Sequence, residues 1–485
     1  MTTKQPMRHL LIFLPGIMGS QLQKGGKDIW TLSNIPFWQA LKALISAGSI
    51  ADLTLRDDDW QHELNDGVVA NKLIADLHAI PRVVTQAGYS PFYERIKSFF
   101  DVTEGSILQP SEKANFFTFP YDWRRDNRAN ARKLGTFIEQ QLPRWRASSG
   151  QSDAQAILIG HSMGGLIARY YVEVLEGWRK TLALITIGTP HWGSVDAVES
   201  ICNGKKIGLS DFTSVVRALT STHQLLPVYQ TLQLEDGSTV RIGEADVPNL
   251  DRARAAAARH DFHEVIWNAA KANRANPAYQ TQTIPWVGVA QDTLLSVARS
   301  NGKVQTRFSL PNGFDGQTGD GDGTVPRFAA IPPELKPTDA RFAVEQHGWL
   351  TNNVQTIDPV LQTIVTLASG LPIAHLGNEK PIPAINVRVN PLVSAADGPQ
   401  ISVQLAGPGS TKRQLAVTVR RVDTASAPIK TTVTALATQS VEVALPHLDP
   451  GLYQVQVTAA RSAKNAPGAI NSVFEVAEDL EIDAA

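Results

Sequence analysis

Ser162, Asp322 and His347 are residues whose types could together perform nucleophilic catalysis in this 485-residue chain. Ser162 is the centre of GHSMG at residues 160–164, a Gly-x-Ser-x-Gly pentapeptide. A serine hydroxyl is a weak nucleophile at neutral pH unless an adjacent base accepts its proton, and a carboxylate must hold that base in the right tautomer. We therefore predict that Ser162 is the nucleophile, His347 its base, and Asp322 the acid that orients the base.

The residues around Ser162 predict a strand, a tight turn and a helix. Residues 156–159 (AILI) are apolar and run directly into the pentapeptide, and apolar residues at mostly helical spacing follow it. The two glycines allow a strained corner at which chain and substrate approach closely. The alternative is a glycine-rich turn with an idle serine, and the strand before it and the helix after it favour the catalytic interpretation. His161 lies inside the turn, and we predict a structural role for it.

The first glycine-rich loop of the chain follows the first predicted strand, at residues 8–14, and reads PGIMGS. Loops at the carboxyl ends of parallel strands are where α/β proteins bind ligands. The backbone N–H groups of Ile17 and of Met163, the residue after the nucleophile, are the candidate oxyanion donors. The alternative is an ordinary turn between a strand and a helix.

The sequence has eleven histidines, and His347 is the strongest candidate for the base. It ends a predicted strand at residues 342–346, precedes a glycine and follows the candidate acid, in the Ser, Asp, His order of α/β-hydrolases. His191 also follows a predicted strand but precedes the acid. Asp322 is favoured over Asp320 because it directly precedes a Gly-Thr-Val-Pro turn. The loop at 315–326 lacks the glutamate that ends an EF-hand, and we predict neither a metal nor a cofactor.

Three further residues are candidates for substrate binding: Asp122, Trp123 and Trp192. The first two close an aromatic strand predicted at residues 115–123, and Trp192 follows a buried strand predicted at 181–187. Trp123 and Arg124 could shape an acyl pocket or a polar head-group site. Alternatively, Asp122 could cap the helix predicted at 127–142, and Arg124 could pair with it.

Composition restricts the partners. Hydrophobic residues make up 43% of the chain, charged residues 19%, and the net charge is −1. No electrostatic attraction to nucleic acid is expected, and contact with lipid must be mainly apolar. A lone cysteine, Cys202, excludes an intrachain disulfide and a thiolate metal cluster. The apolar run near the N-terminus is too short for the hydrophobic core of a signal peptide. We therefore expect a cytoplasmic protein, with signal-independent export left open.

We predict two domains. Residues 1–376 form an α/β-hydrolase domain with a parallel sheet and cap insertions at about 21–110 and 195–283. Within the first insertion, Phe37, Leu41, Leu44 and Ile45 share a helical face that could dock on lipid or face the core. Residues 381–485 have the short alternating segments of an all-β, immunoglobulin-like sandwich, after a linker at 376–383. This sandwich is interpreted as a stabilising module or one that binds a protein partner, and the alternative is a domain that binds a specific lipid or glycan.

Six motifs in order carry a family resemblance: PGIMGS, PYDWR, GHSMGGL, IGTPHWGS, GDGTVP and the final histidine. Over residues 8–369 the chain resembles the lecithin:cholesterol acyltransferase and phospholipid:diacylglycerol acyltransferase family of α/β-hydrolases. The resemblance implies an acyl-enzyme on Ser162, completed by Asp322 and His347, with Ile17 and Met163 as oxyanion donors and a glycerolipid ester as acyl donor. One departure is the lone cysteine, because secreted members of the family carry disulfides.

The predicted function is that of a serine-dependent lipid acyl hydrolase or acyltransferase, similar to a phospholipase A. It implies a lipid ester as substrate and transient contact with a membrane or micelle surface. Two alternatives remain open. One is a carboxylesterase for soluble esters, and the other is a non-catalytic scaffold that binds a protein partner through the β-sandwich.

Overall fold

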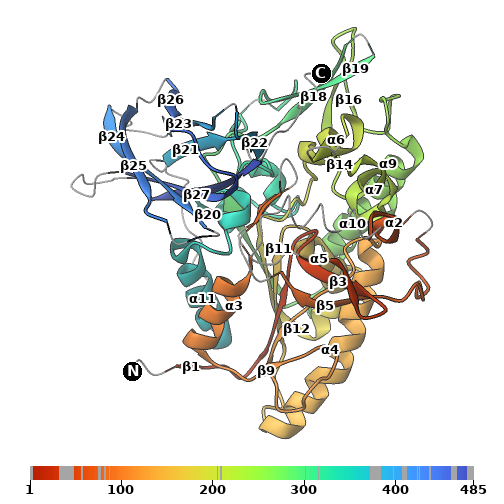
Figure 1. The fold of residues 1–485 in the computed structure, drawn as a ribbon. Helices are drawn as coiled ribbons and strands as arrows, with labels where there is room; N and C mark the ends of the chain where they lie inside the picture. Colours follow the sequence, from red (N-terminus) through yellow and green to blue (C-terminus); the bar gives the residue numbers. More distant parts are fainter. Residues whose placement is uncertain are drawn as a thin grey trace.

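A parallel sheet forms the centre of the protein (Figure 1). The computed structural model describes residues 4–31, 49–55, 58–74, 78–80, 84–86, 88–204, 206–207, 210–300, 302–314, 316–371, 384–390, 392–396, 398–406, 412–422, 424, 426–435, 439–459 and 467–477. In spatial order, the strands of the sheet are β20 (Arg341–Ala343), β17 (Gln282–Gly288), β12 (Thr181–Ile187), β11 (Ala156–His161), β2 (Leu10–Leu14), β10 (Phe116–Thr118) and β9 (Glu104–Gly105).

The central strands are apolar throughout because both faces of the sheet are covered. In β2, Leu10, Ile12 and Leu14 belong to one hydrophobic cluster, whereas Leu11 and Phe13 belong to another. This division follows from the two-residue period of a strand, which directs successive side chains to opposite faces.

Two pairs of helices cover the faces (Figure 1). Helices α4 (Asn127–Ser149) and α5 (Met163–Glu173) contribute buried side chains to the first cluster. Helices α3 (Ser90–Phe99) and α11 (Val354–Ala368) contribute to the second and contact each other. The predicted α/β class with a parallel sheet is therefore confirmed. No helix in the described ranges combines the length and the apolarity needed to cross a membrane.

The segment between β2 and β10 contains several small elements in addition to α3. These are the antiparallel sheet of β4 (Lys27–Trp30), β3 (Ser20–Lys24) and β5 (Val68–Leu73), helix α2 (Ser49–Leu53), the hairpin of β6 (His78–Ile80) and β7 (Val84–Gln86), and strand β8 (Phe100–Asp101). Strand β8 pairs in parallel with β1 (Gln5–Pro6), which precedes β2. The helical face predicted from Phe37, Leu41, Leu44 and Ile45 lies outside the described residues.

The insertion between β12 and β17 is largely helical. It contains α6 (Val195–Cys202), β13 (Lys206–Ile207), β14 (Ser210–Asp211), α7 (Thr213–Ala218), α8 (Thr220–His223), β15 (Gln230–Gln233), β16 (Thr239–Arg241), α9 (Arg252–Ala257), a π-helix at Ala258–His263 and α10 (Glu264–Arg274). The predicted hairpin around residues 235–238 is present as β15 and β16. Unexpectedly, β18 (Ser296–Ser300) and β19 (Lys303–Arg307) extend the same small sheet from beyond β17.

The C-terminal region is all-β in its described parts, as predicted, and forms two sheets. One is β21 (Ala384–Val389), β23 (Gln400–Ala406) and β26 (Val441–Ala444); the other is β22 (Leu392–Ser394), β28 (Ile470–Ala477), β27 (Gly451–Ala459), β24 (Arg413–Arg421) and β25 (Ile429–Ala435). Side chains from both sheets share one hydrophobic cluster. The hydroxyl of Tyr453 donates to the carbonyl oxygen of Asp449 at 2.8 Å, which ties the turn before β27 to that strand. The predicted linker at 376–383 lies outside the described residues.

The C-terminal sheets, drawn in blue in Figure 1, pack against the loops that follow β17 and β20. The side-chain amide of Gln346 donates to the carbonyl oxygen of Val387 at 2.8 Å. Trp349 packs with Leu452 and Val473 in a small buried cluster. The loop that carries His347 is therefore held between the central sheet and the β-sandwich.

Candidate active site

Ser162 lies at the sharp corner between β11 and α5. Its backbone has φ 51° and ψ −124°, a conformation that is costly for a residue with a side chain. The neighbouring Gly164 permits this corner, because a Cβ atom there would lie 2.3 Å from the carbonyl oxygen of Pro15. The close approach joins the corner to the loop after β2, so the nucleophile and the first glycine-rich loop are fixed relative to each other.

Asp322 and His347 are in direct contact. Nδ1 of His347 donates to Oδ2 of Asp322 at 2.7 Å, and the other carboxylate oxygen accepts from the backbone N–H groups of Thr324 (3.0 Å) and Val325 (2.7 Å). This arrangement holds the proton on Nδ1 and leaves the lone pair on Nε2. Within the described part of the chain, Nε2 is buried without a hydrogen-bond partner. In enzymes without bound substrate, the hydrogen bond between a nucleophilic serine and the ring nitrogen of its histidine is often long.

The rival residues lie elsewhere. Oδ2 of Asp320 accepts from the backbone N–H of Ala290 at 2.7 Å and from the guanidinium of Arg327 at 2.8 Å. His191 is buried against Arg169, with 3.2 Å between its Nδ1 and Nη1 of the arginine. Burial lowers the pKa of His191 well below its usual range, so this ring stays neutral inside the core.

An apolar cavity contains both Ser162 and His347. It encloses about 640 Å³, part of it open to solvent. One wall is the loop after β2, which includes Ile17, and the opposite wall comes from α6 to α8 and the residues after them, including Val216, Leu219 and Leu225. The mostly apolar lining of this cavity suits an acyl chain.

The two candidate oxyanion donors lie at the same end of the sheet. Ile17 lines the cavity beside Ser162. Met163 is the first residue of α5, so its N–H belongs to the helix-terminal groups that have no partner within the helix. This position places a backbone donor directly after the nucleophile.

A chain of hydrogen bonds connects the first glycine-rich loop to the histidine loop. The N–H of Gly16 donates to the hydroxyl oxygen of Tyr89 at 2.7 Å, and that hydroxyl lies 2.9 Å from Nδ1 of His161. Nε2 of His161 lies 3.1 Å from the carbonyl oxygen of His347. Burial lowers the pKa of His161 to about 3, so the neutral ring donates from Nε2 and accepts from Tyr89 at Nδ1.

No local sequence pattern indicated a role for Tyr89 in the site, because the residues around it predict only the start of a helix. The hydrogen-bond partners of its hydroxyl are Gly16 and His161, which are 73 and 72 residues away in the chain. Its contribution is to position the backbone around Ile17 and His347.

The predicted substrate-binding residues Asp122, Trp123 and Trp192 do not line the described walls of the apolar cavity. Asp122 forms an ion pair with Arg124 at 2.7 Å, as one of the two interpretations expected. Trp123 is buried, and its Nε1 donates to the carbonyl oxygen of Ser20 at 3.1 Å. Nε1 of Trp192 donates to the carbonyl oxygen of Ile331 at 2.9 Å. The three side chains therefore support the walls around the site.

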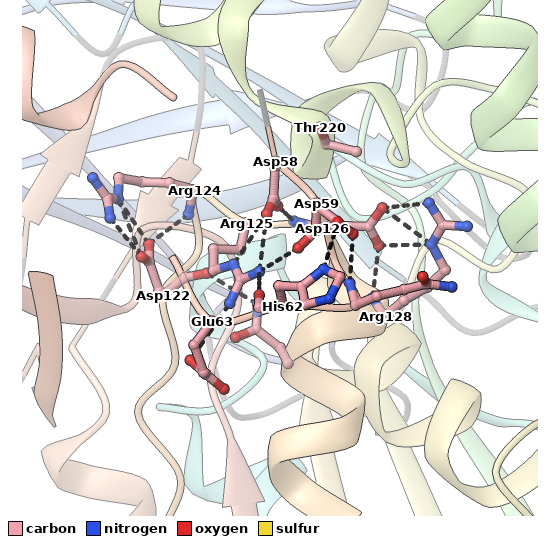
Figure 2. A network of polar contacts seen from close by, with 12 residues as sticks. Asp58, Asp59, His62, Glu63, Asp122, Arg124, Arg125, Asp126, Arg128 and Thr220 are labelled. Atoms are coloured by element: carbon pink, nitrogen blue, oxygen red, sulfur yellow. Dashed lines mark hydrogen bonds and ion pairs between the residues drawn. The ribbon is translucent and has the colours of Figure 1, made fainter. Parts of the chain in front are cut away.

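A network of ion pairs surrounds the start of α4 (Figure 2). Asp126, rather than Asp122, caps this helix, since its side chain accepts from the backbone N–H of Arg128 at 2.8 Å. The carboxylate of Asp58 accepts from Arg125 at 3.0 Å and also from the N–H of Asp126. The side chains of Asp58 and Arg125 are only 1% and 9% exposed, so the pair joins the first insertion to the hydrolase core at a place largely shielded from water.

We expect Asp58→Ala to lower the free energy of unfolding by about 3–5 kcal/mol, because it leaves the Arg125 guanidinium buried without its carboxylate. Urea-induced unfolding measures this loss. Glu63→Ala is the matched control, since Glu63 faces the same guanidinium at 3.7 Å but is 84% exposed. The control should cost less than about 1 kcal/mol. Equal losses in both variants would contradict the structural role given to Asp58.

Glu345 is a buried carboxylate two residues before His347. Its side chain accepts from the side chain of Asn353 at 2.6 Å and from the N–H of Gln346 at 2.9 Å, and it interacts with Asn471 of the β-sandwich. Burial raises the pKa of Glu345 from 4.5 to about 7, against the effect of these hydrogen bonds.

Because this pKa is raised on folding, the folded state keeps a proton that the unfolded state has already lost between pH 4.5 and about 7. The contribution of Glu345 to stability is fully present below pH 4.5, falls through this window and is constant above it. Glutamine does not titrate, so we expect Glu345→Gln to remove this loss of stability with rising pH. The free energy of unfolding of the variant, minus that of the wild type, should therefore increase by about 3 kcal/mol between pH 4.5 and pH 8. Urea unfolding at both pH values measures it, and an unchanged difference would contradict the prediction.

Residues 109–281 match the family model of lecithin:cholesterol acyltransferase. The matched range contains PYDWR, GHSMGGL and IGTPHWGS, and it confirms the family resemblance over that part of the chain. The match supports lipid acyl hydrolase or acyltransferase activity. No curated protein matches the sequence significantly.

Three solved structures resemble the chain weakly. A lipase of Bacillus licheniformis, BlEst2, shares 9% identity in its propeptide form, over 98% of this chain and 94% of the lipase, with a TM-score of 0.34. Its mature form shares 12% identity over 75% of this chain and 95% of the lipase, with a TM-score of 0.34. Phospholipase PlaB of Legionella pneumophila shares 10% identity over 98% of this chain and 91% of the phospholipase, with a TM-score of 0.20. At such low TM-scores the resemblances say nothing about chemistry.

Proposed function

We propose that this chain, which matches the acyltransferase family over residues 109–281, is a serine-dependent lipid acyl hydrolase or acyltransferase that uses Ser162, His347 and Asp322. The observation that carries the proposal is the apolar cavity that contains Ser162 and His347 together, with Asp322 bonded to the histidine. A glycerolipid ester, taken from a membrane or micelle surface, is the proposed substrate.

Acylation begins when Oγ of Ser162 attacks the ester carbonyl carbon and its proton passes to Nε2 of His347. The N–H groups of Ile17 and Met163 stabilise the negative charge that develops on the carbonyl oxygen. When the bond from the carbonyl carbon to the alcohol oxygen breaks, His347 returns the proton to that oxygen. The alcohol leaves, and the acyl group remains on Ser162.

Deacylation repeats the sequence with a second hydroxyl compound. Water or an acceptor alcohol gives its proton to Nε2 of His347 and attacks the acyl carbon, and Ser162 recovers the proton as its bond to that carbon breaks. Water yields a fatty acid, whereas an alcohol yields a new ester. The apolar walls of the cavity hold the acyl chain through both steps and reduce the water around the reacting atoms.

The test is to analyse, by mass spectrometry, the products of wild-type protein and Ser162→Ala on vesicles of phospholipid and neutral lipid, with and without an added alcohol. Fatty acid with lysophospholipid, absent in the variant, would support a hydrolase, and an ester of the added alcohol would support a transferase. Ser152→Ala, at an exposed serine, is the control and should match the wild type. Cleavage of a short soluble ester without any lipid product would favour a carboxylesterase instead. If a fluorophosphonate labelled Ser162→Ala as well as the wild type, the catalytic role of Ser162 would be excluded.

A further inference from the structure

A second cavity adjoins His347, and the β-sandwich supplies part of its wall. It encloses about 540 Å³, part of it open to solvent. The hydrolase side contributes Asp292 and the loops around Asp322 and His347, and the sandwich contributes residues 387–389 of β21 and Ser472 of β28. The C-terminal region is therefore part of the surroundings of the catalytic histidine.

The two cavities differ in chemical character but meet at the same residues. Both are lined by His347 and Thr324, but the first has mostly apolar walls, and the second contains the charged side chains of Asp292 and Arg388. An ester also has two different sides, an acyl chain and an alcohol. Because His347 must protonate the departing alcohol oxygen, the alcohol side of the substrate must lie next to this histidine.

Apart from Asp322, which is bonded to His347, the charged groups in the described lining of the second cavity are one anion and one cation. The guanidinium of Arg388 forms an ion pair with the carboxylate of Asp292, and the two side chains are 56% and 41% exposed. The same guanidinium lies 4.8 Å from the centre of the Phe308 ring. A zwitterionic head group can present its phosphate to Arg388 and its ammonium group to Asp292, whereas an anionic head group is repelled by Asp292.

The position of Arg388 relative to His347 is fixed by the backbone of β21. The amide of Gln346 donates to the carbonyl oxygen of Val387 at 2.8 Å, and the amide of Gln291 donates to that of Ile385 at 2.9 Å. These two hydrogen bonds bind the strand to the loops after β20 and β17. Arg388 is therefore placed by the hydrolase domain as well as by the sandwich.

We infer that the second cavity is the subsite for the alcohol side of the ester, and that Arg388 and Asp292 select a zwitterionic phospholipid head group. The inference rests on the proposed lipid acyl chemistry. It makes the β-sandwich a determinant of substrate specificity, in addition to its stabilising contacts.

The test compares kcat/KM on micelles of phosphatidylcholine, on micelles of phosphatidylglycerol and on a short soluble ester. Arg388→Gln should lower the value for phosphatidylcholine about tenfold relative to the short ester, as expected for the loss of one charge-assisted contact. Asp292→Asn should raise the ratio of phosphatidylglycerol to phosphatidylcholine about tenfold, because it removes the repulsion. Arg420→Gln, at an exposed arginine of β24, is the control and should leave all ratios as in the wild type.

Thermal unfolding of each variant shows whether it is folded, and the exposed ion pair should contribute little to stability. If folded Arg388→Gln and Asp292→Asn both keep the wild-type ratios on the two phospholipids, the head-group subsite is wrong although the lipid activity stands. If the wild-type protein cleaves the short ester but neither phospholipid, the proposed lipid function fails together with the subsite.

Discussion

Asp322→Asn should lower kcat on a short ester about 10⁴-fold while the protein stays folded. Oδ1 of Asp322 accepts two backbone N–H groups, so the carbonyl oxygen of an asparagine must take that place. Its NH₂ group then faces Nδ1 of His347 in place of the oxygen that now lies 2.7 Å away. The imidazole would have to carry its proton on Nε2, where it cannot accept the proton of Ser162. Steady-state kinetics with a soluble chromogenic ester measures the loss.

Asp320→Asn is the matched control, because it is the same change two residues away. The carboxylate of Asp320 bonds to the backbone N–H of Ala290 and to the guanidinium of Arg327 instead of to His347. We expect less than about a tenfold loss of kcat, since the imidazole keeps its tautomer. A larger loss in Asp320→Asn than in Asp322→Asn would reverse the assignment of the acid.

Gly164→Ala should lower kcat on the same ester at least about 100-fold, through loss of the oxyanion donor geometry. The added methyl group would lie 2.3 Å from the carbonyl oxygen of Pro15 and 2.6 Å from that of Leu14. Because backbone atoms form this contact, a side chain cannot rotate away to relieve it. The loop that carries Ile17 must then move away from Ser162. Kinetics, together with circular dichroism to check the fold, tests the prediction.

Gly319→Ala is the control for this prediction. A methyl group at that position meets side-chain atoms only at 3.5 Å and beyond, which is ordinary van der Waals contact. It should keep the activity of the wild type. If Gly164→Ala were as active as this control, the close approach of α5 to the first glycine-rich loop would not be needed for catalysis.

The central strands and the residues of the candidate site were predicted from the amino-acid sequence alone. A strand that is buried on both faces must be apolar throughout. Strands β2, β11 and β12 were therefore predictable from their uninterrupted runs of apolar residues. Ser162, Asp322 and His347 lie next to turns, and the glycines and prolines of those turns can be recognised in the local sequence. In the structure, Asp322 and His347 are bonded to each other although they are 25 residues apart.

The surroundings of that site depend on contacts that form only in the folded chain. Trp123 and Trp192 were expected to bind substrate, but the sequence could not show that each has a backbone carbonyl from a distant segment as its partner. Tyr89 was not recognised for the same reason, since both its partners come from other loops.

The role of the β-sandwich shows the same division. Its alternating segments predicted its strands, because a strand that is half-buried alternates locally between apolar and polar residues. Nothing in residues 381–485 indicated that Arg388 lines a cavity together with His347. This placement depends on two hydrogen bonds between β21 and loops 41 and 94 residues away. Short-range patterns encode elements and reactive groups, whereas the walls of a cavity arise where distant segments pack together, and only the folded chain brings those segments into contact.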